Sequence, residues 1–347
     1  MPDIGLHRNT MGSPCPATTA ALRSGRMRDN PRLLIVNHKP EAFLPMIRAK
    51  LAEQDIAVCS HARDLPATIA QHRPDIAFAT RMPGTTPADY APLCTAPSVR
   101  WIQACNVGIE HLGDWDPRII VTNCAGVLSD FNAEYIFGAI MSVNAGFALY
   151  RDQQKQRQWQ PHERRGLRDQ TVLIIGLGAI GGRVATRAKA FGMRVIGIRA
   201  HVRPTEHVDE VLPLEALPSA MPRADFIVVI VPVTASTRGL VGARLLDLAK
   251  PGAVLVNAAR GGIVDEAALA NCLKSGRLKA AVIDVFAEEP LPADSPLWGI
   301  DNLHITPHIS GTVTDWRERW TAFFLENLER FRTGQPLSNV VDPARRY

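Results

Sequence analysis

The stretch TVLIIGLGAIGG, residues 171–182, joins a continuous apolar run to glycines at the spacing G-x-G-x-x-G. A helical pattern over residues 183–191 follows directly. In a dinucleotide-binding turn, Gly176 would allow the tight turn, Gly178 a close approach of the backbone to a pyrophosphate, and Gly181 close packing of helix on strand. The N–H groups at the helix N-terminus would then face the phosphates. The stretch therefore predicts a dinucleotide-binding turn rather than an ordinary strand–helix connection.

The position of this turn indicates a second domain, because about half of the 347 residues precede it. From the turn onward, six apolar, mostly β-branched runs alternate with helical patterns, as in a doubly wound parallel sheet buried on both faces. These predicted strands are Val172–Gly176, Arg194–Ile198, Phe226–Val231, Ala253–Asn257, Ala281–Val285 and Leu303–Thr306. An earlier α/β alternation contains the candidates Leu33–Val36, Ala57–His61, Ile76–Thr80, Arg100–Ala104 and Ile119–Asn123.

We therefore predict an α/β fold of two Rossmann-like domains. A doubly wound, parallel-sheet nucleotide-binding domain, residues 126–311, is inserted in a flavodoxin-like substrate-binding domain, residues 31–125 and 312–347. Two helices are expected at the seams, one from Asn132 to about Arg151 with Asp130 as its cap, and one from Asp315 to about Thr333. Residues 1–30, rich in Thr, Ser, Pro and Arg, are expected to be a disordered tail or an over-extended start rather than a transit peptide, which would be amphipathic.

The composition limits the kinds of ligand and environment that we expect for this protein. With 46% hydrophobic and 21% charged residues and no apolar run of about 18 residues, we expect a soluble protein without a membrane span. The net charge of +5 suits anionic small molecules and is too diffuse to indicate nucleic acid. The six cysteines form no C-x-x-C pair, so we predict neither a metal site nor disulfides, and a reducing, cytoplasmic location.

The second predicted strand after the glycine turn bears on the choice of cofactor. A ribose-binding Asp or Glu usually stands about 20 residues past the turn, where this chain has Arg199, followed by Arg203. Arginine can form charge-assisted bonds to the extra phosphate of NADP, which a carboxylate would repel. We therefore expect NADP(H) to be preferred, with NAD(H) possible; a solvated arginine at a strand end is the alternative.

Polar groups follow the last three predicted strands, where ligands of open α/β sheets bind. Asn257-Ala-Ala-Arg260-Gly261 follows one strand, Asp284 to Pro290 the next, and Pro307-His308 the last. With Trp101-Ile-Gln, Asn106-Val-Gly108, Val121-Thr-Asn and Gly176–Gly182, the ordered set resembles the D-isomer-specific 2-hydroxyacid dehydrogenase family, particularly its glyoxylate/hydroxypyruvate reductase-like members. The resemblance covers Arg32 to Tyr347.

The resemblance implies His308 as acid/base, Glu289 as its partner, Arg260 as the substrate-orienting cation, and backbone N–H groups of Val107 and Gly108 as donors to the substrate carboxylate. It also implies a set of cofactor-binding residues: Gly176, Gly178, Ala179, Ile180, Gly181, Arg199, Arg203, Val231, Pro232, Thr237, Ala258, Ala259, Arg260, Asp284, His308, Ser310 and Gly311. Asp284 is expected to bond the nicotinamide amide; a structural carboxylate at a strand end is the alternative.

These roles match the chemistry of 2-oxo acid reduction, in which the carbonyl carbon takes a hydride and its oxygen a proton. A histidine, with an unperturbed pKa near 6.5, can donate that proton. A carboxylate at Glu289 would favour the imidazolium form and fix its orientation. Arg260 can bind the substrate carboxylate and polarise the carbonyl. In the reverse direction, neutral His308 would accept the alcohol proton.

Other functions remain open at this point. Glu289 argues against a formate dehydrogenase, which would pair its histidine with Gln, whereas a short-form phosphoglycerate dehydrogenase is compatible and a long form would continue into a regulatory domain. A nucleotide-sensing binding protein, like the co-repressors of this fold, is the alternative from another class. Cys105 lacks an activating base and is expected to be a packed thiol. The polar stretch Gln153–Arg168 is a mobile loop or, as in relatives, part of the homodimer interface that we expect.

Overall fold

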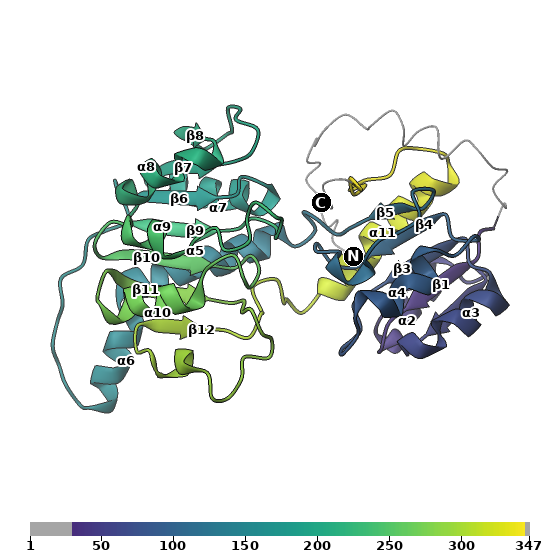
Figure 1. Ribbon diagram of the computed structural model, residues 1–347, viewed down its shortest axis with the longest axis horizontal. Coiled ribbons are helices and arrows are strands. Elements are labelled where there is room, and N and C mark those ends of the chain that lie inside the picture. Colours follow the sequence, from purple (N-terminus) through teal and green to yellow (C-terminus); the bar gives the residue numbers. More distant parts are fainter. Residues whose placement is uncertain (1–29, 344–347) are drawn as a thin grey trace. The chain divides into compact units, whose positions relative to one another are not determined.

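The computed structural model describes residues 30–343 (Figure 1). Of the predicted tail, only Asn30 falls within this range, and Cys15 lies outside it. The chain forms two compact units. The first contains the residues up to Val127 and those from Arg317 onward, and the second contains Leu128–Trp316.

The first unit is built on a five-stranded parallel sheet with the order β2-β1-β3-β4-β5. This is the order of flavodoxin-like sheets. The strands are β1 (Leu33–Val36), β2 (Ile56–Cys59), β3 (Ile76–Ala79), β4 (Trp101–Ala104) and β5 (Ile120–Thr122). The helices are α2 (Leu44–Lys50), α3 (Leu65–His72), α4 (Pro87–Cys94) and α11 (Trp316–Arg332), with short 3-10 turns η1 (Pro40–Ala42), η2 (Ala62–Asp64) and η3 (Glu110–Leu112).

The C-terminal helix α11 returns to the first sheet through aromatic packing. Phe324 lies 4.7 Å from Phe78 and 5.6 Å from Trp101, and Phe331 stacks on Trp101 at 5.3 Å, measured between ring centroids. All four rings are buried, and aromatic pairs at these distances stabilise a core beyond their buried area. The aromatic face of α11 thus explains the predicted return of the chain to its first α/β unit.

A buried hydrogen-bond network joins the same helix to the sheet. The amide oxygen of Gln103 accepts from the Thr122 hydroxyl at 2.9 Å and from Asn327 Nδ2 at 3.2 Å. Trp101 Nε1 donates to the Thr122 hydroxyl at 2.8 Å. Because buried polar groups are costly when unpaired, this network specifies how α11 sits on the sheet.

The second unit is built on a seven-stranded parallel sheet with the order β12-β11-β10-β9-β6-β7-β8. Counted from β6, this is the doubly wound nucleotide-binding order with one further strand at the β12 edge. The strands are β6 (Thr171–Ile175), β7 (Arg194–Ile198), β8 (Glu210–Leu212), β9 (Phe226–Val229), β10 (Ala253–Asn257), β11 (Leu278–Ile283) and β12 (Leu303–Ile305). The prediction of two parallel-sheet, Rossmann-like folds is confirmed, and the edge strand β8 is an addition to it.

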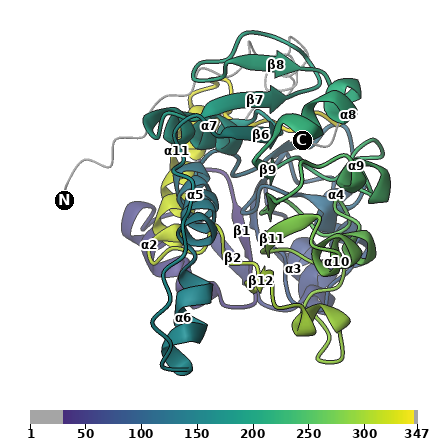
Figure 2. The same cartoon turned by 90° about the vertical axis from the view of Figure 1, so that its left-hand side faces the viewer.

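Helices cover both faces of the second sheet (Figure 2). Residues of α5 and α7 pack on one face and residues of α8, α9 and α10 on the other, so the sheet interior is apolar on both sides. The helices are α5 (Ser129–Ala145), α6 (Phe147–Lys155), α7 (Ala179–Ala190), α8 (Leu217–Ala220), α9 (Ala243–Asp247) and α10 (Glu266–Lys274), with turns η4 (Leu214–Ala216), η5 (Met221–Arg223) and η6 (Pro296–Gly299).

The predicted helix after Asn132 differs from the structure in two respects. It is two helices, α5 and α6, because Gly146 takes a left-handed conformation with φ of 75° and ends α5. Asp130 is not its cap: Leu128 occupies that position, and Asp130 lies in the first turn. There its carboxylate pairs with the guanidinium groups of Arg183 and Arg187 on α7.

In the described part of the chain, no helix is long and apolar enough to cross a membrane.

Candidate active site

The glycine turn has the geometry that its sequence predicts. Gly176 has φ of +114°, and a Cβ there would lie 2.4 Å from the carbonyl oxygen of Ile230. A Cβ on Gly181 would lie 2.0 Å from the carbonyl oxygen of Gly176, so this residue allows α7 to approach β6 closely. Gly178, by contrast, is exposed and has nothing within 4 Å of its Cβ position. A ligand can therefore approach its backbone at the N-terminus of α7.

Arg199 follows β7 and is partly buried. Its Nη1 donates to the Thr205 hydroxyl at 3.2 Å. Burial, and secondarily repulsion from the nearby charge of Arg203, lowers the pKa of Arg199 below its ordinary value. An anion bound between the two guanidinium groups would relieve that repulsion. The predicted phosphate-binding arginines are therefore brought together at the end of β7.

The loops after β9 and β10 are fixed by short polar contacts. The Thr237 hydroxyl donates to Pro232 O at 2.6 Å and accepts from Thr234 N at 2.8 Å. After β10, the buried Asn257 accepts from Ala259 N at 3.1 Å through its amide oxygen. These bonds organise the segments that contain the predicted cofactor residues Val231, Pro232, Thr237, Ala258 and Ala259.

Arg260, Glu289 and His308 occupy the segments that follow β10, β11 and β12, which are neighbours in the sheet. Arg260 Nη1 donates to Ala259 O at 2.8 Å. The next residue, Gly261, is packed so tightly that a Cβ would lie 1.8 Å from Phe286 O. The loop that carries Arg260 is therefore pressed against the loop that leads to Glu289.

The decisive contact of the site joins His308 to Glu289. The imidazole Nδ1 lies 2.8 Å from Glu289 Oε2, and Glu289 Oε1 accepts from Phe286 N at 2.9 Å. Because an ionised carboxylate can only accept, Nδ1 carries the hydrogen of this bond. Nε2 is then the ring nitrogen that this bond leaves available. The structure thus brings together the two side chains that the sequence predicts as an acid/base pair, and their catalytic role stays a prediction.

Asp284 shapes the loop on which His308 lies. Its side chain is fully buried and accepts from Ile309 N at 2.8 Å, Ser310 N at 2.8 Å and the Thr306 hydroxyl at 2.6 Å. These bonds give Asp284 a structural role; its contact with a nicotinamide amide stays a prediction. Sequence reasoning missed Tyr135 and Asn132, two α5 residues that also contact this loop.

The predicted carboxylate-binding loop lies in the first unit, after β4. Val107 is 48% exposed, and its carbonyl oxygen accepts from Asn123 Nδ2 at 2.9 Å. The backbone N–H groups of Val107 and Gly108 donate to no acceptor within residues 30–343. Burial raises the pKa of the Cys105 thiol well above its ordinary value, with a smaller contribution from Cys124. Cys105 is therefore a packed thiol in a loop whose N–H groups are available to an anion.

Among the described residues, no three His, Cys, Asp or Glu side chains are grouped so that they could hold a metal ion. The five cysteines in residues 30–343 are buried and free.

Comparison with known proteins identifies the family. The profile of the NAD-binding domain of D-isomer specific 2-hydroxyacid dehydrogenases matches residues 137–310, half of the chain. The chain belongs to the D-isomer-specific 2-hydroxyacid dehydrogenase family. It is 33% identical over 270 residues to a glyoxylate reductase of Korarchaeum cryptofilum, a match that covers 74% of this chain and 80% of that protein.

Two further relatives show the range of the family. A D-3-phosphoglycerate dehydrogenase of Methanocaldococcus jannaschii is 33% identical over 71% of this chain, which spans only 48% of that protein. The solved structure of an NADPH-dependent glyoxylate/hydroxypyruvate reductase of Sinorhizobium meliloti, in complex with NADP and sulfate, is 26% identical. Its TM-score is 0.78, and the alignment covers 91% of this chain and 100% of that one. The predicted NAD(P)-dependent 2-hydroxyacid dehydrogenase is thereby confirmed at the level of the family.

Proposed function

We propose that this dehydrogenase reduces a small 2-oxo acid, of the glyoxylate or hydroxypyruvate type, to the D-2-hydroxy acid with NAD(P)H, and catalyses the reverse oxidation. The observation that carries the proposal is the 2.8 Å contact between His308 Nδ1 and Glu289 Oε2, behind a glycine turn that fits a dinucleotide. This pairing requires the reacting proton to be at Nε2, which suits reversible protonation of a carbonyl oxygen.

In the proposed mechanism, each side chain acts on the substrate. Imidazolium His308 donates its Nε2 proton to the carbonyl oxygen, and Glu289 stabilises that cation and fixes the ring. Arg260 pairs with the substrate carboxylate and stabilises negative charge on the carbonyl oxygen. The N–H groups of Val107 and Gly108 offer further donors to the carboxylate. In oxidation, neutral His308 accepts the hydroxyl proton through Nε2.

The dinucleotide is proposed to be NADP(H), with NAD(H) as a possible substitute. The open space at the Cβ position of Gly178, the N-cap of α7, fits the approach of a pyrophosphate. Arg199 and Arg203 fit a 2′-phosphate, and no acidic residue stands at the usual ribose position of β7. When bound, the reduced nicotinamide supplies the hydride. The remaining predicted cofactor residues lie on the loops described above.

The direct test is oxidation of NADPH and NADH, followed by absorbance, with glyoxylate, hydroxypyruvate, pyruvate and phenylpyruvate. We expect turnover that is faster with NADPH, and a loss of most turnover in His308→Ala with NADPH binding retained. Oxidation of 3-phosphoglycerate in preference to reduction of these acids would support the alternative indicated by the M. jannaschii relative. Firm NADPH binding without turnover of any acid would instead support a nucleotide-sensing protein.

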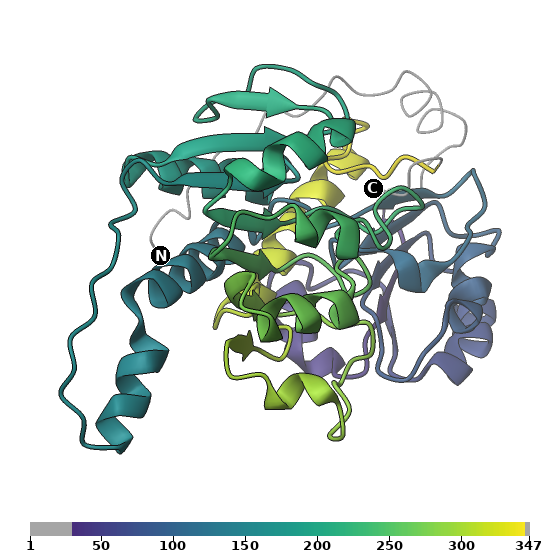
Figure 3. The ribbon, with the colours of Figure 1, turned by 60° about the vertical axis from the view of Figure 1, so that its left-hand side comes forward.

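We also propose a homodimer that uses α6 and the segment 156–170, which extend away from the second sheet (Figure 3). This part of the chain exposes apolar side chains: Trp159 is 98% exposed and Phe147 is 65% exposed. A second copy of the chain would cover them, since exposed aromatic groups are typical of interaction surfaces. The buried thiols of the described residues also suit a reducing, cytoplasmic location.

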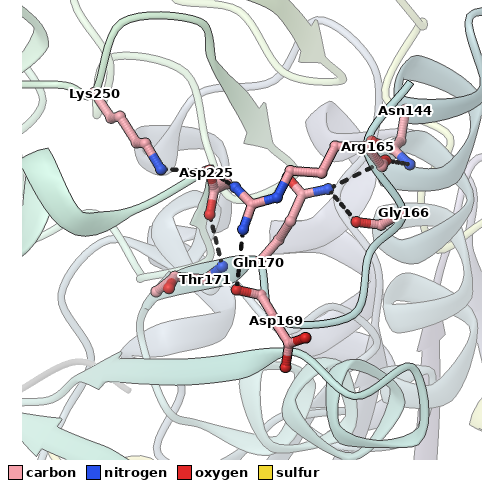
Figure 4. A network of polar contacts seen from close by, with 8 residues as sticks. All are labelled: Asn144, Arg165, Gly166, Asp169, Gln170, Thr171, Asp225 and Lys250. Atoms are coloured by element: carbon pink, nitrogen blue, oxygen red, sulfur yellow. Dashed lines mark hydrogen bonds and ion pairs between the residues drawn. The ribbon is translucent and has the colours of Figure 1, made fainter. Parts of the chain in front are cut away.

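The end of this segment is fixed to the sheet by a polar network (Figure 4). The Asp225 carboxylate pairs with Lys250 Nζ at 2.7 Å and Arg165 Nη1 at 3.4 Å, and accepts from Thr171 N at 2.8 Å. Asn144 Nδ2 donates to Arg165 O at 3.1 Å. These contacts fix the C-terminal end of the segment 156–170 to the second sheet. The exposed Trp159 therefore lies on a segment that is held at this end.

Sedimentation velocity tests the dimer. We expect a dimer for the native chain and a shift toward monomer in the double variant Phe147→Ala, Trp159→Ala. Trp298→Ala is the matched control, because Trp298 is also an exposed tryptophan of the second unit, 54% exposed, but lies outside the segment. A monomeric native chain, or an unchanged dimer in the double variant, would refute this interface.

A further inference from the structure

The loop that carries His308 has a conformation that must be held in place. His308 has φ of +54°, in the left-handed region that residues with a Cβ rarely adopt. Its N–H group donates to Asp284 O at 2.9 Å and to Thr306 O at 3.1 Å. The next two N–H groups, of Ile309 and Ser310, donate to the Asp284 carboxylate. The direction of the catalytic ring therefore depends on where Asp284 holds this loop.

A chain of hydroxyl groups extends from Asp284 to α5. The Thr306 hydroxyl lies 2.6 Å from Asp284 Oδ1 and 2.5 Å from the Tyr135 hydroxyl. The Thr306 hydroxyl has a single hydrogen, and the carboxylate can only accept. That hydrogen therefore goes to Asp284, and Tyr135 is the donor to Thr306. Burial raises the pKa of Tyr135 to about 12, which keeps the phenol protonated as this donor role requires.

Helix α5 also holds the far end of the same loop. Asn132, one turn before Tyr135, accepts from the Ser310 hydroxyl at 3.1 Å. A Cβ on Gly311 would lie 3.1 Å from Asn132 Nδ2, so the backbone passes directly over this side chain. The loop 306–311 is thus fixed to α5 on both sides of His308.

We propose that Tyr135 is a positioning residue for His308, acting through Thr306 and Asp284 to keep Nδ1 on Glu289 and Nε2 available for proton transfer. The inference rests on the proposed function of His308 as acid/base. Tyr135 lies on the helix that begins where the chain passes from the first unit to the second, at residues 127/128. Movement of α5 would therefore reach the acid/base residue through two hydroxyl groups.

The test is Tyr135→Phe, which removes only the donor. If this hydrogen bond positions His308, kcat for 2-oxo acid reduction falls about tenfold, the equivalent of one hydrogen bond of ordinary strength. The dissociation constant of NADPH should change little. Loss of a part-buried hydrogen bond also lowers the melting temperature, so kcat, measured well below that temperature, is the readout that a purely structural role would not change. Tyr90→Phe is the control, since the buried Tyr90 hydroxyl donates to Thr80 O and accepts from Met82 N in the first unit, and its loss should lower stability and leave kcat unchanged.

Thr306 provides the same test from the other side of the bond. Thr306→Val should lower kcat at least as much as Tyr135→Phe, and Thr306→Ser, which keeps the hydroxyl, should restore it. Adding Tyr135→Phe to Thr306→Val should have no further effect, because the two groups form one chain. The variants Thr306→Val and Thr306→Ser also test the proposal if Tyr135→Phe does not fold.

The outcomes separate this inference from the proposed function. Absence of turnover in the native chain, or full turnover in His308→Ala, would remove the proposed function itself. Native turnover with an inactive His308→Ala and a fully active Tyr135→Phe would overturn the positioning role alone. Multiplicative effects of Tyr135→Phe and Thr306→Val would also overturn it, because the two hydroxyl groups would then act separately.

Discussion

Glu289→Gln changes one charge and almost no volume at the centre of the proposed acid/base pair. Glu289 Oε2 accepts from His308 Nδ1 at 2.8 Å, and Oε1 accepts from Phe286 N at 2.9 Å. A glutamine amide has one oxygen and one NH2 group, so it can replace only one of these acceptors. Either the imidazole loses its acceptor at Nδ1, or the backbone N–H of Phe286 faces another donor.

The size of the effect follows from the strength and exposure of the bond. A hydrogen bond to a charged group contributes about 1.5–3 kcal/mol. The His308 and Glu289 side chains are 45% and 35% exposed, so screening by solvent places the effect near the lower limit. At 1.36 kcal/mol per factor of ten, the loss in kcat/KM is about tenfold. The KM for NADPH should change little, because Glu289 is not among the predicted cofactor-binding residues.

Steady-state reduction of hydroxypyruvate by NADPH measures this loss, and oxidation of the hydroxy acid measures it in reverse. A variant cannot change the equilibrium constant, so the specificity constants must fall by the same overall factor in both directions. Glu288→Gln is the matched control, because it removes the same charge from an exposed neighbouring residue. Equal kcat/KM values in Glu289→Gln and Glu288→Gln would refute the assignment of Glu289 as the partner of His308.

Three further predictions concern the turn, the cofactor and pH. Gly181→Ala puts a Cβ 2.0 Å from a backbone oxygen and should abolish folding or NADPH binding. Gly182→Ala has open space around its Cβ and should stabilise α7 by up to about 1 kcal/mol. Thermal melts and NADPH titration compare the two variants. Arg199→Asp should raise the NADH/NADPH ratio of kcat/KM at least about tenfold, and an unchanged ratio would assign the 2′-phosphate to another residue. Burial lowers the pKa of His111 to about 4 in the folded protein. Between about pH 6.5 and pH 4, the unfolded chain therefore binds a proton that the folded chain does not. The free energy of unfolding should fall by up to about 3 kcal/mol as pH decreases through that range. His111→Gln should flatten this dependence in urea unfolding, and an equally steep curve would exclude His111 as its source.

The sequence was sufficient to predict the two sheets because their strands are continuous buried apolar runs. Leu33–Val36, Arg194–Ile198 and Ala253–Asn257 were predicted with the bounds that the structure has. The edge strand Glu210–Leu212 was missed because it has three partly buried residues and no apolar run. The break at Gly146 could have been recognised, since glycine is the usual residue at a left-handed helix end.

The sequence predicts the loops of the site better than it predicts the contacts between them. Local patterns located the loops, because each follows a strand with a clear signal. The sequence alone predicts Asp130 as a helix cap, because its partners, Arg183 and Arg187, are more than 50 residues away in the chain. Tyr135 gave no signal, since it lies in an apolar helical pattern and its partner Thr306 is 171 residues later. Contacts of this length are set by the packing of α5 on the sheet, which single-sequence patterns do not contain.

In the proposed site, the strand order separates the arginines that would bind a 2′-phosphate from the residues that would transfer the proton. Arg199 follows β7, the glycine turn follows β6, and Arg260, Glu289 and His308 follow β10, β11 and β12. Parallel strands lie about 4.8 Å apart, so β7 and β10, three steps apart in the order, are separated by about 14 Å across the sheet. Groups this far apart without shared partners act independently. Selection for one cofactor can therefore change the residues after β7 while the acid/base pair beyond β11 keeps its geometry.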